Sequence, residues 1–385
     1  MQRILIVRAS AIGDVVFASP LAAALRRSHP QAHIAWLVEP GIDRLIDGDP
    51  AIDECIVWPK KQWLALLRRG RWLALGREIR RFRAALRERR FDLALDLHGL
   101  FKSAFLAWLS GAPRRIGLGA REGSAWFVTE VIPRGGDPAR ISSEYLYLAR
   151  HLGLDCGEFL PHLHVRPEEA AVAETLLREH GIEPGRFAVF AAFTTRPQKH
   201  WFADAWRDLA ATLRARTGLV PVLLGSPDDR EAAADIARPE TGIIDLSGRT
   251  NLAQAAAVVR ASALVVGVDT GLTHMGIAFG VPTVALFGST CPYTVTGRAN
   301  ARVVRLGLSC SPCHRTPTCG GAFTCMRDIT AAHALRVALE VLGAAGQGTM
   351  AEDPVSHEPG SCGTGAEPVQ ETRAVDRDGP MTVGQ

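Results

Sequence analysis

Polar residues that could do chemistry gather in three short segments, each directly after an apolar run. In the first segment, residues 4–20, an apolar run leads into small residues and then Gly13 and Asp14. Ligands of open α/β sheets bind at the carboxyl ends of strands, so this turn would lie at a site. Asp14 is then either a helix N-cap or a general base for a substrate hydroxyl. The segment lacks the Gly-x-Gly-x-x-Gly spacing, which weakens a dinucleotide-binding interpretation.

The second segment, residues 191–201, carries hydroxyl groups and cations between a predicted strand and a predicted helix. It contains Thr194, Thr195 and Lys199. Hydroxyls and backbone N–H groups hydrogen-bond phosphate oxygens while a lysine supplies charge. The alternative is a solvated loop with a helix cap. Lys199 is one of only four lysines in the chain, against forty arginines, which favours a specific role.

The third segment, residues 267–282, places Asp269, Thr270, Gly271 and His274 where an apolar run passes into a helix. Exposed N–H groups and the positive end of the helix dipole make such a start an anion site. Asp269 would cap this helix or accept a hydrogen bond from a sugar hydroxyl. A histidine one turn inside a helix is more often packed than chemical, but this one lies beside the predicted phosphate cradle.

The elements that must position these segments repeat twice along the chain. Short apolar runs alternate with helix-length amphipathic stretches, which is typical of buried parallel strands covered on both faces. The runs are residues 4–8, 33–38, 55–58, 93–97 and 115–118, then 187–193, 221–225, 242–246, 263–268, 283–287 and 303–306. This pattern predicts an α/β protein with two doubly wound domains facing a cleft, at residues 1–165 and 166–345. Residues 346–385, rich in Gly, Pro and acids, are expected to form a disordered acidic tail.

Composition and charge narrow the class of protein. Of 385 residues, 47% are apolar and 22% charged, which excludes a wholly disordered or fibrous protein. No apolar run is long enough for a membrane helix, and the charged start is unlike a signal peptide, so a cytoplasmic protein is expected. Residues 60–90 hold twelve Lys or Arg against two Glu, interleaved with Trp and Leu. This stretch is either an interfacial helix or an ordinary covering helix. No nucleic-acid-binding motif accompanies it, so no nucleic-acid partner is expected.

Four of the eight cysteines, Cys310, Cys313, Cys319 and Cys325, fall within sixteen residues. Four thiolates can hold zinc tetrahedrally, but these spacings differ from those of a standard zinc finger. Reduced, unligated thiols are therefore expected, with a structural zinc site as the alternative.

Together these segments resemble the family 9 glycosyltransferases, and within that family the lipopolysaccharide heptosyltransferases, most of all the heptosyltransferase I branch. The likeness rests on RASAIGDVV, TTRPQKHW and GVDTGLTHMGIAFGVPTVALFGST. The stretch from Asp96 to Ser103 and the segment Ala120-Arg121-Glu122 also match. The resemblance covers about residues 1–343 and leaves the tail unmatched.

The resemblance implies a GT-B fold of two Rossmann-like domains and an inverting transfer that needs no metal. It implies ADP-heptose as co-substrate, no cofactor, and the lipid A-linked inner core (Kdo-lipid A) as acceptor. The enzyme would then work in the cytoplasm, peripherally at the inner face of the inner membrane.

The same resemblance implies roles for single residues. Asp14 would be the catalytic base, and Lys199 would stabilise the leaving ADP. Contacts to the donor would come from Thr194, Thr195, Lys199, Asp229, Asp269, Thr270, Gly271 and His274, with Asp229 in place of a Glu that holds the ribose. Phosphates and acidic sugars of the acceptor would meet Lys60, Lys61, Lys102 and Arg121.

Three alternatives remain at this stage. One is heptosyltransferase II or another sugar transferase of family 9. The second is a nucleotide-sugar epimerase on the same fold, which would need neither Asp14 nor the basic aromatic stretch for a lipid-linked acceptor. The third is a zinc-dependent binding module without turnover.

Overall fold

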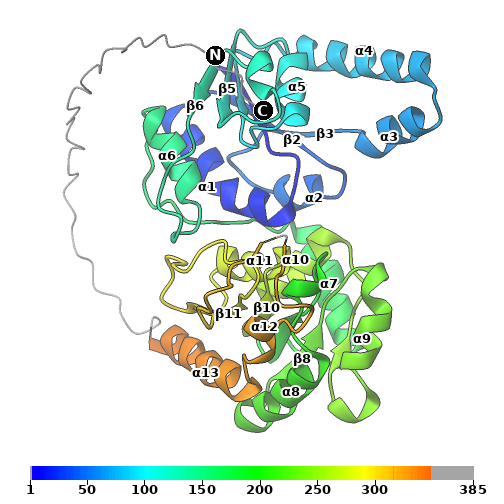
Figure 1. The fold of residues 1–385 in the computed structure, drawn as a ribbon, viewed down its shortest axis with the longest axis vertical. Coiled ribbons are helices and arrows are strands. Elements are labelled where there is room, and N and C mark those ends of the chain that lie inside the picture. Colours follow the sequence, from blue (N-terminus) through cyan, green and yellow to red (C-terminus); the bar gives the residue numbers. More distant parts are fainter. Residues whose placement is uncertain (1, 315, 348–385) are drawn as a thin grey trace, which may run out of the picture.

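A computed structural model describes residues 2–314 and 316–347, which form two α/β units stacked along the long axis of the molecule (Figure 1). The tail expected over residues 346–385 lies outside the described residues, except for its first two. Those two residues end the last helix, α13, which runs to Gln347.

The first unit is built on a parallel sheet with the strand order β3-β2-β1-β4-β5-β6. Its strands are β1 (Arg3–Val7), β2 (His33–Val38), β3 (Glu54–Val57), β4 (Leu93–Asp96), β5 (Arg114–Leu118) and β6 (Glu130–Ile132). The order reverses between β1 and β4, so the crevice where doubly wound sheets bind ligands lies beyond these two strands.

The second unit repeats this topology with the order β12-β11-β10-β7-β8-β9. Its strands are β7 (Phe187–Ala191), β8 (Val220–Leu223), β9 (Ile244–Asp245), β10 (Leu264–Val268), β11 (Thr283–Leu286) and β12 (Ala301–Val304). Here the order reverses between β7 and β10. The predicted pair of Rossmann-like sheets is confirmed. At each reversal point, a segment singled out in the sequence follows the carboxyl end of a strand.

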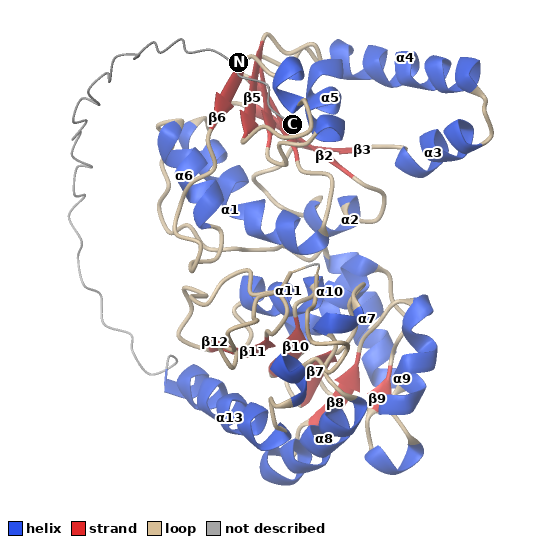
Figure 2. Ribbon diagram, in the orientation of Figure 1, coloured by secondary structure: helices blue, strands red, loops and turns tan. Residues whose placement is uncertain are grey.

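Helices cover both faces of each sheet (Figure 2). Those of the first unit are α1 (Ile12–Ser28), α2 (Asp43–Ile46), α3 (Lys60–Arg68), α4 (Trp72–Glu88), α5 (Phe101–Leu109) and α6 (Ser143–His151). Those that follow are α7 (Pro167–Glu179), α8 (Ala203–Thr217), α9 (Arg230–Ile236), α10 (Leu252–Ala261), α11 (Gly271–Phe279), α12 (Thr324–Arg327) and α13 (Ala331–Gln347). Short 3-10 turns span Ser124–Phe127, Pro197–Lys199, Pro227–Asp229 and Pro239–Thr241.

Alternate residues of the central strands feed two hydrophobic layers, as the period of a strand requires. On β1, Ile4 and Ile6 pack in the layer of α1 and α6, whereas Leu5 and Val7 pack in the layer of α5. The layer that holds Ile4 continues into the second unit, where it takes in residues of β7 and α10. The two units therefore share buried apolar surface.

Two glycines let the start of α1 lie against the start of α11. A Cβ on Gly13 would fall 2.7 Å from Cδ2 of His274, and one on Gly271 would fall 2.7 Å from Cγ2 of Ile12. No real Cβ tolerates such contacts, so a larger residue at either position would push the helix starts apart. Elsewhere, Ile141 of the first unit donates its N–H to the carbonyl of Val295 at 3.0 Å.

The structure departs from the sequence-based expectation at β6 and in the basic stretch. The short edge strand β6 was missed because its three residues include a charged Glu130. The basic stretch forms two helices rather than one, since the chain breaks at Gly70, whose φ of +66° favours glycine. None of the described helices is long and apolar enough to cross a membrane.

Candidate active site

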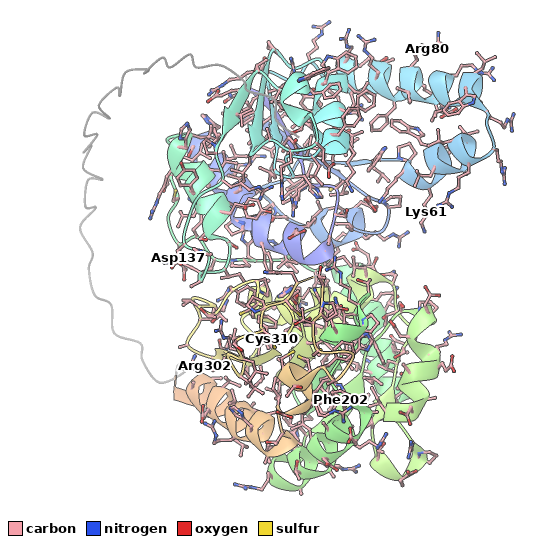
Figure 3. All side chains as sticks on the ribbon, in the orientation of Figure 1. Lys61, Arg80, Asp137, Phe202, Arg302 and Cys310 are labelled. Atoms are coloured by element: carbon pink, nitrogen blue, oxygen red, sulfur yellow. The ribbon has the colours of Figure 1, made fainter. Side chains whose placement is uncertain are left out.

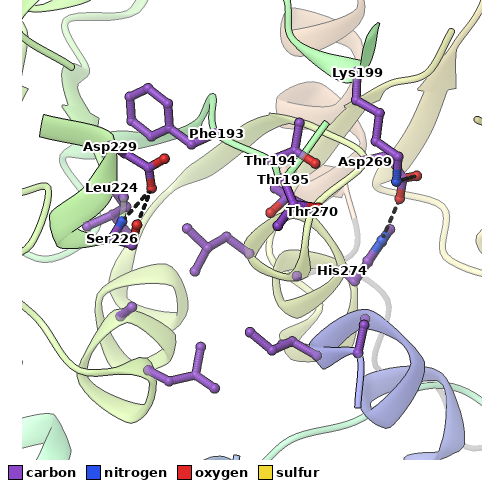
Figure 4. A pocket seen from close by; sticks show the side chains of 18 of the residues that line it. Phe193, Thr194, Thr195, Lys199, Leu224, Ser226, Asp229, Asp269, Thr270 and His274 are labelled. Carbon is purple, nitrogen blue, oxygen red and sulfur yellow. Dashed lines mark hydrogen bonds and ion pairs between the residues drawn. The ribbon is translucent and has the colours of Figure 1, made fainter. Parts of the chain in front are cut away.

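A cavity of about 760 Å³ lies between the two units and brings the three segments together. The first unit contributes residues 11–14 and Phe17, and the second unit contributes the rest of the wall. Figure 4 shows the labelled donors and acceptors that line it. A volume of this size suits a ligand larger than a simple sugar.

Asp14 lines this cavity from the first turn of α1. The residue that caps the helix is Ala11, so the N-cap interpretation of Asp14 is wrong: Asp14 is the third residue inside the helix. Its Oδ2 accepts the N–H of Ala11 at 3.2 Å and pairs with Nη2 of Arg8 at 2.6 Å. Since both contacts fall on Oδ2, they leave Oδ1 for a ligand.

Arg8, which the sequence interpretation missed, holds the Asp14 carboxylate in place. Its guanidinium is buried and also donates to the carbonyl of Leu97 at 3.0 Å. Burial alone would lower the pKa of Arg8, but Tyr145 and Asp14 nearby raise it overall. The pKa of the neighbouring His98 is instead lowered to about 3, by burial and by the charge of Arg8. In the sequence, the one feature that could have pointed to Arg8 is its place as a charged residue at the end of the apolar run 4–8.

On the facing side of the cavity, Asp269 organises a polar network. Its Oδ2 accepts from Nζ of Lys199 at 2.6 Å and from Oγ1 of Thr290 at 2.5 Å, and its Oδ1 pairs with Nε2 of His274 at 3.1 Å. Nδ1 of His274 meets the hydroxyl of Tyr293 at 2.7 Å. Sequence reasoning placed Thr290 in the motif but not in the site, and it missed Tyr293, whose role depends on tertiary contact.

This network keeps Asp269 charged. Burial alone would raise the pKa of its carboxyl, but the hydrogen bond and charge of His274, together with Lys199, hold it well below its usual range. An ammonium has three N–H donors, so Lys199 retains two after its contact with Asp269. Lys199 is thus held in place with donors to spare for an anion.

The start of α11 and the loop after β7 supply further donors. Thr194, Thr195, Thr270 and Gly271 all line the cavity. The first N–H groups of a helix have no partner within it and favour anions. The loop is fastened where Nε2 of His200 meets the carbonyl of Thr194 at 2.8 Å. Hydroxyls, amides and an ammonium therefore converge as a phosphate cradle requires.

Asp229 lies across the cavity from Lys199 (Figure 4). Its Oδ2 accepts both the N–H and the hydroxyl of Ser226, each at 2.7 Å. Phe193 and Leu224 line the wall beside it. A carboxylate next to apolar side chains is the combination that a ribose and a planar base would meet.

The four predicted acceptor cations do not line this cavity. Lys60, Lys102 and Arg121 follow β3, β4 and β5, so they lie at the same edge of the first sheet as Asp14. Nζ of Lys60 pairs with Oε1 of Glu39 at 2.7 Å, and Glu39 also accepts the hydroxyl of Ser10 at 2.9 Å. The fourth, Lys61, is exposed on α3. None of the four therefore forms part of the cavity wall.

The chain belongs to glycosyltransferase family 9 (heptosyltransferase), whose model matches residues 79–321. It is therefore a glycosyltransferase of the kind that builds the lipopolysaccharide core, rather than an epimerase. It is 32% identical to lipopolysaccharide heptosyltransferase 1 of Pseudomonas aeruginosa over 324 residues, 81% of this chain and 86% of that protein.

Solved structures of E. coli heptosyltransferases have the same fold as this chain. E. coli ADP-heptose lipopolysaccharide heptosyltransferase II superposes with a TM-score of 0.68 at 25% identity, over 90% of this chain and 100% of that one. E. coli heptosyltransferase WaaC with ADP-2-deoxy-2-fluoro heptose gives 0.67 at 26% identity, over 88% and 99%. The fold is the GT-B arrangement of these enzymes, as the resemblance implied.

Proposed function

We propose that this enzyme transfers heptose from ADP-heptose to the Kdo-lipid A inner core, as heptosyltransferase I does, by an inverting mechanism that needs no metal at the reacting centre. The observation that carries the proposal is the cavity in which Asp14 of one unit faces Lys199 and the α11 start of the other. Identity to the Pseudomonas heptosyltransferase 1 favours type I. Structural similarity to a type II enzyme is equally high, so type II remains the second candidate.

In this proposal the donor lies along the second unit. The diphosphate takes the N–H groups at the start of α11 and the spare donors of Lys199, and the ribose meets Asp229. The negative charge that develops on ADP as it leaves is stabilised by groups already in position. The carboxylates nearest the reacting centre, Asp14 and Asp269, are each already paired with a protein cation. The protein thus provides the charge that a metal ion would supply elsewhere.

Asp14 is the base. Its Oδ1 takes the proton of the acceptor hydroxyl while that oxygen forms a bond to the anomeric carbon of heptose. The bond from this carbon to the diphosphate oxygen breaks, and its electron pair leaves with ADP. The base lies on the first unit, whereas the groups that hold ADP lie on the second. Attack therefore comes from the face opposite ADP, and the configuration at the anomeric carbon inverts. Lys60, Lys102 and Arg121 hold the acidic groups of the acceptor at the sheet edge.

The deciding experiment is mass spectrometry of products after incubation with ADP-heptose and truncated lipopolysaccharide acceptors. One heptose added to Kdo-lipid A, with an inverted anomeric configuration by NMR and no dependence on added Mg²⁺, is the expected result. Transfer only to an acceptor that already carries heptose would establish type II instead. Failure to transfer heptose to any of these acceptors would refute the proposal.

We also propose that α3 and α4 hold the enzyme peripherally at the membrane surface where its lipid-linked acceptor lies. The two helices project from the first unit, with Lys61 and Arg80 on them (Figure 3). The side chain of Trp63 is buried, but those of Trp72 and Leu73 are 65% and 84% exposed. Exposed apolar residues among cations are typical of helices that bind anionic lipid surfaces.

The double variant Trp72→Ser/Leu73→Ser is therefore expected to bind anionic vesicles at least about tenfold more weakly, since burying each such side chain contributes about 1.5–3 kcal/mol. Vesicle co-sedimentation measures this. The matched control is Val172→Ser, which removes an exposed apolar side chain from α7 of the other unit. Equal binding by the double variant and the control would place the membrane contact elsewhere.

A further inference from the structure

The four clustered cysteines line one small cavity beside the active site. Cys310, Cys313, Cys319 and Cys325 line a space of about 20 Å³, together with Ser289, Thr318, Phe323 and Thr324. A space of this size holds about one water-sized occupant. Figure 3 places Cys310 in the second unit, on the side toward the first. Four soft ligands around a single-atom space are what a thiolate-bound metal requires.

Binding requires the sulfurs to draw together. In a tetrahedral site with bonds of about 2.3 Å, they lie about 3.8 Å apart. Within the described part of the chain, only Asp49, His162 and His164 already bring three ligand atoms within 4.8 Å of one another. There, the buried Asp49 carboxylate already has protein partners, because it accepts from His162 at 3.1 Å and from the N–H of Ala51 at 2.8 Å. Apart from Cys325 on α12, the cysteines lie in loops and not in a helix or strand.

We propose that Cys310, Cys313, Cys319 and Cys325 bind one Zn²⁺ or Fe²⁺ ion as thiolates, and that this ion fixes the loop that presents Thr290 to the active site. Tetrahedral sulfur ligation is shared by these two ions. The site is distinct from the donor cavity, so the ion acts through position and not on the substrate.

Hydrogen bonds connect the cysteine loop to the catalytic network. The hydroxyl of Ser311 donates to the carbonyl of Gly288 at 2.6 Å, and the N–H of His314 donates to the carbonyl of Ser289 at 2.7 Å. The next residue, Thr290, donates to Asp269. Nε2 of Gln198, next to Lys199, donates to the carbonyl of His314 at 3.2 Å. Both partners of Asp269 at Oδ2 are thereby tied to the cysteine loop.

The loop after β11 also packs tightly against the segment that carries Cys325. A Cβ on Gly288 would fall 2.6 Å from Sδ of Met326 and 2.8 Å from Sγ of Cys325. The loop after β11 therefore rests directly on a proposed ligand, and a shift of Cys325 would move it.

The test uses the full chain purified under reducing, anaerobic conditions. Mass spectrometry of metals is expected to find about one zinc or iron per chain, and which of the two it finds identifies the ion. After metal removal, four more thiols should react with a thiol reagent than before. Reconstitution with Co²⁺ should give the visible bands of a tetrahedral cobalt–thiolate centre. None of these measurements depends on heptose transfer, so the metal site and the proposed function fail separately.

The double variant Cys310→Ser/Cys313→Ser should lose the metal, and the control Cys55→Ser on β3 of the other unit should keep it. Metal removal should also speed hydrogen exchange in residues 288–290 and raise the KM for donor more than it lowers kcat. Metal-free protein that neither takes up Zn²⁺, Fe²⁺ or Co²⁺ nor protects its thiols would overturn the proposal. So would disulfides among the four cysteines. The cobalt bands and thiol counts are measured on the unaltered chain, so they test the metal site even if the variant misfolds.

Discussion

Asp14→Asn is expected to lower turnover by about 10²–10⁴-fold, the usual contribution of a general base. Asn has the size of Asp, and its amide oxygen can still accept from Arg8 and from the N–H of Ala11. It cannot take the proton of an acceptor hydroxyl. Donor affinity should hardly change, because the donor groups lie on the other unit. Steady-state kinetics with ADP-heptose and acceptor, beside calorimetric ADP binding, measure both quantities.

Stability should change little in this variant. The Asp14 side chain is 39% exposed, and the amide oxygen of the substituted residue still accepts from the buried guanidinium of Arg8. The loss is then the difference between a hydrogen bond to a charged group and one to a neutral group, about 1 kcal/mol. Assays well below the melting temperature then report chemistry alone. The matched control is Asp43→Asn, since Asp43 also lies in the first turn of a helix and accepts a backbone N–H, from Gly41 at 2.7 Å. A fully active, normally folded Asp14→Asn enzyme would show that the base is another group.

Sequence periodicity predicted most of the fold because each central strand is buried on both faces. The runs at residues 4–8 and 187–193 needed no tertiary information to be identified as strands. Edge strands such as β6 and β9 are short and partly polar, so local pattern did not define them well. The close approach of α1 and α11 was also beyond prediction, because it depends on the space around Gly13 and Gly271 rather than on any periodic pattern.

The site was predictable to the extent that each segment follows the carboxyl end of a strand. The structure brings the three segments to one cavity, while their chemical roles remain predictions. What sequence reasoning missed are partners that only the folded chain brings into contact. Arg8 lies outside the predicted set although it holds Asp14, and Tyr293 is nineteen residues from His274, which it contacts. Whether Asp14 was an N-cap also could not be read from the sequence, because Ala11 is a rare choice for that position.

Lys199→Ala should lower transfer by about 10- to 150-fold, because a charge-assisted hydrogen bond to phosphate contributes about 1.5–3 kcal/mol. The variant removes the ammonium that stabilises ADP as it leaves, and it also removes one partner of Asp269. Thr290 and His274 still hold that carboxylate, so the fold should persist. Donor titration by calorimetry and single-turnover kinetics separate weaker donor binding from slower ADP departure.

Two variants show whether the effect belongs to this ammonium. Arg196→Ala removes a cation from the same loop that does not line the cavity, and it should leave transfer nearly unchanged. Lys199→Arg keeps the charge, but its planar fork cannot reproduce a point contact shared between Asp269 and a phosphate. It should therefore recover only part of the loss. If Lys199→Ala bound donor and released ADP at the normal rate, the leaving group would have to be stabilised by the N–H groups of α11 alone, and Lys199 would serve only to hold Asp269.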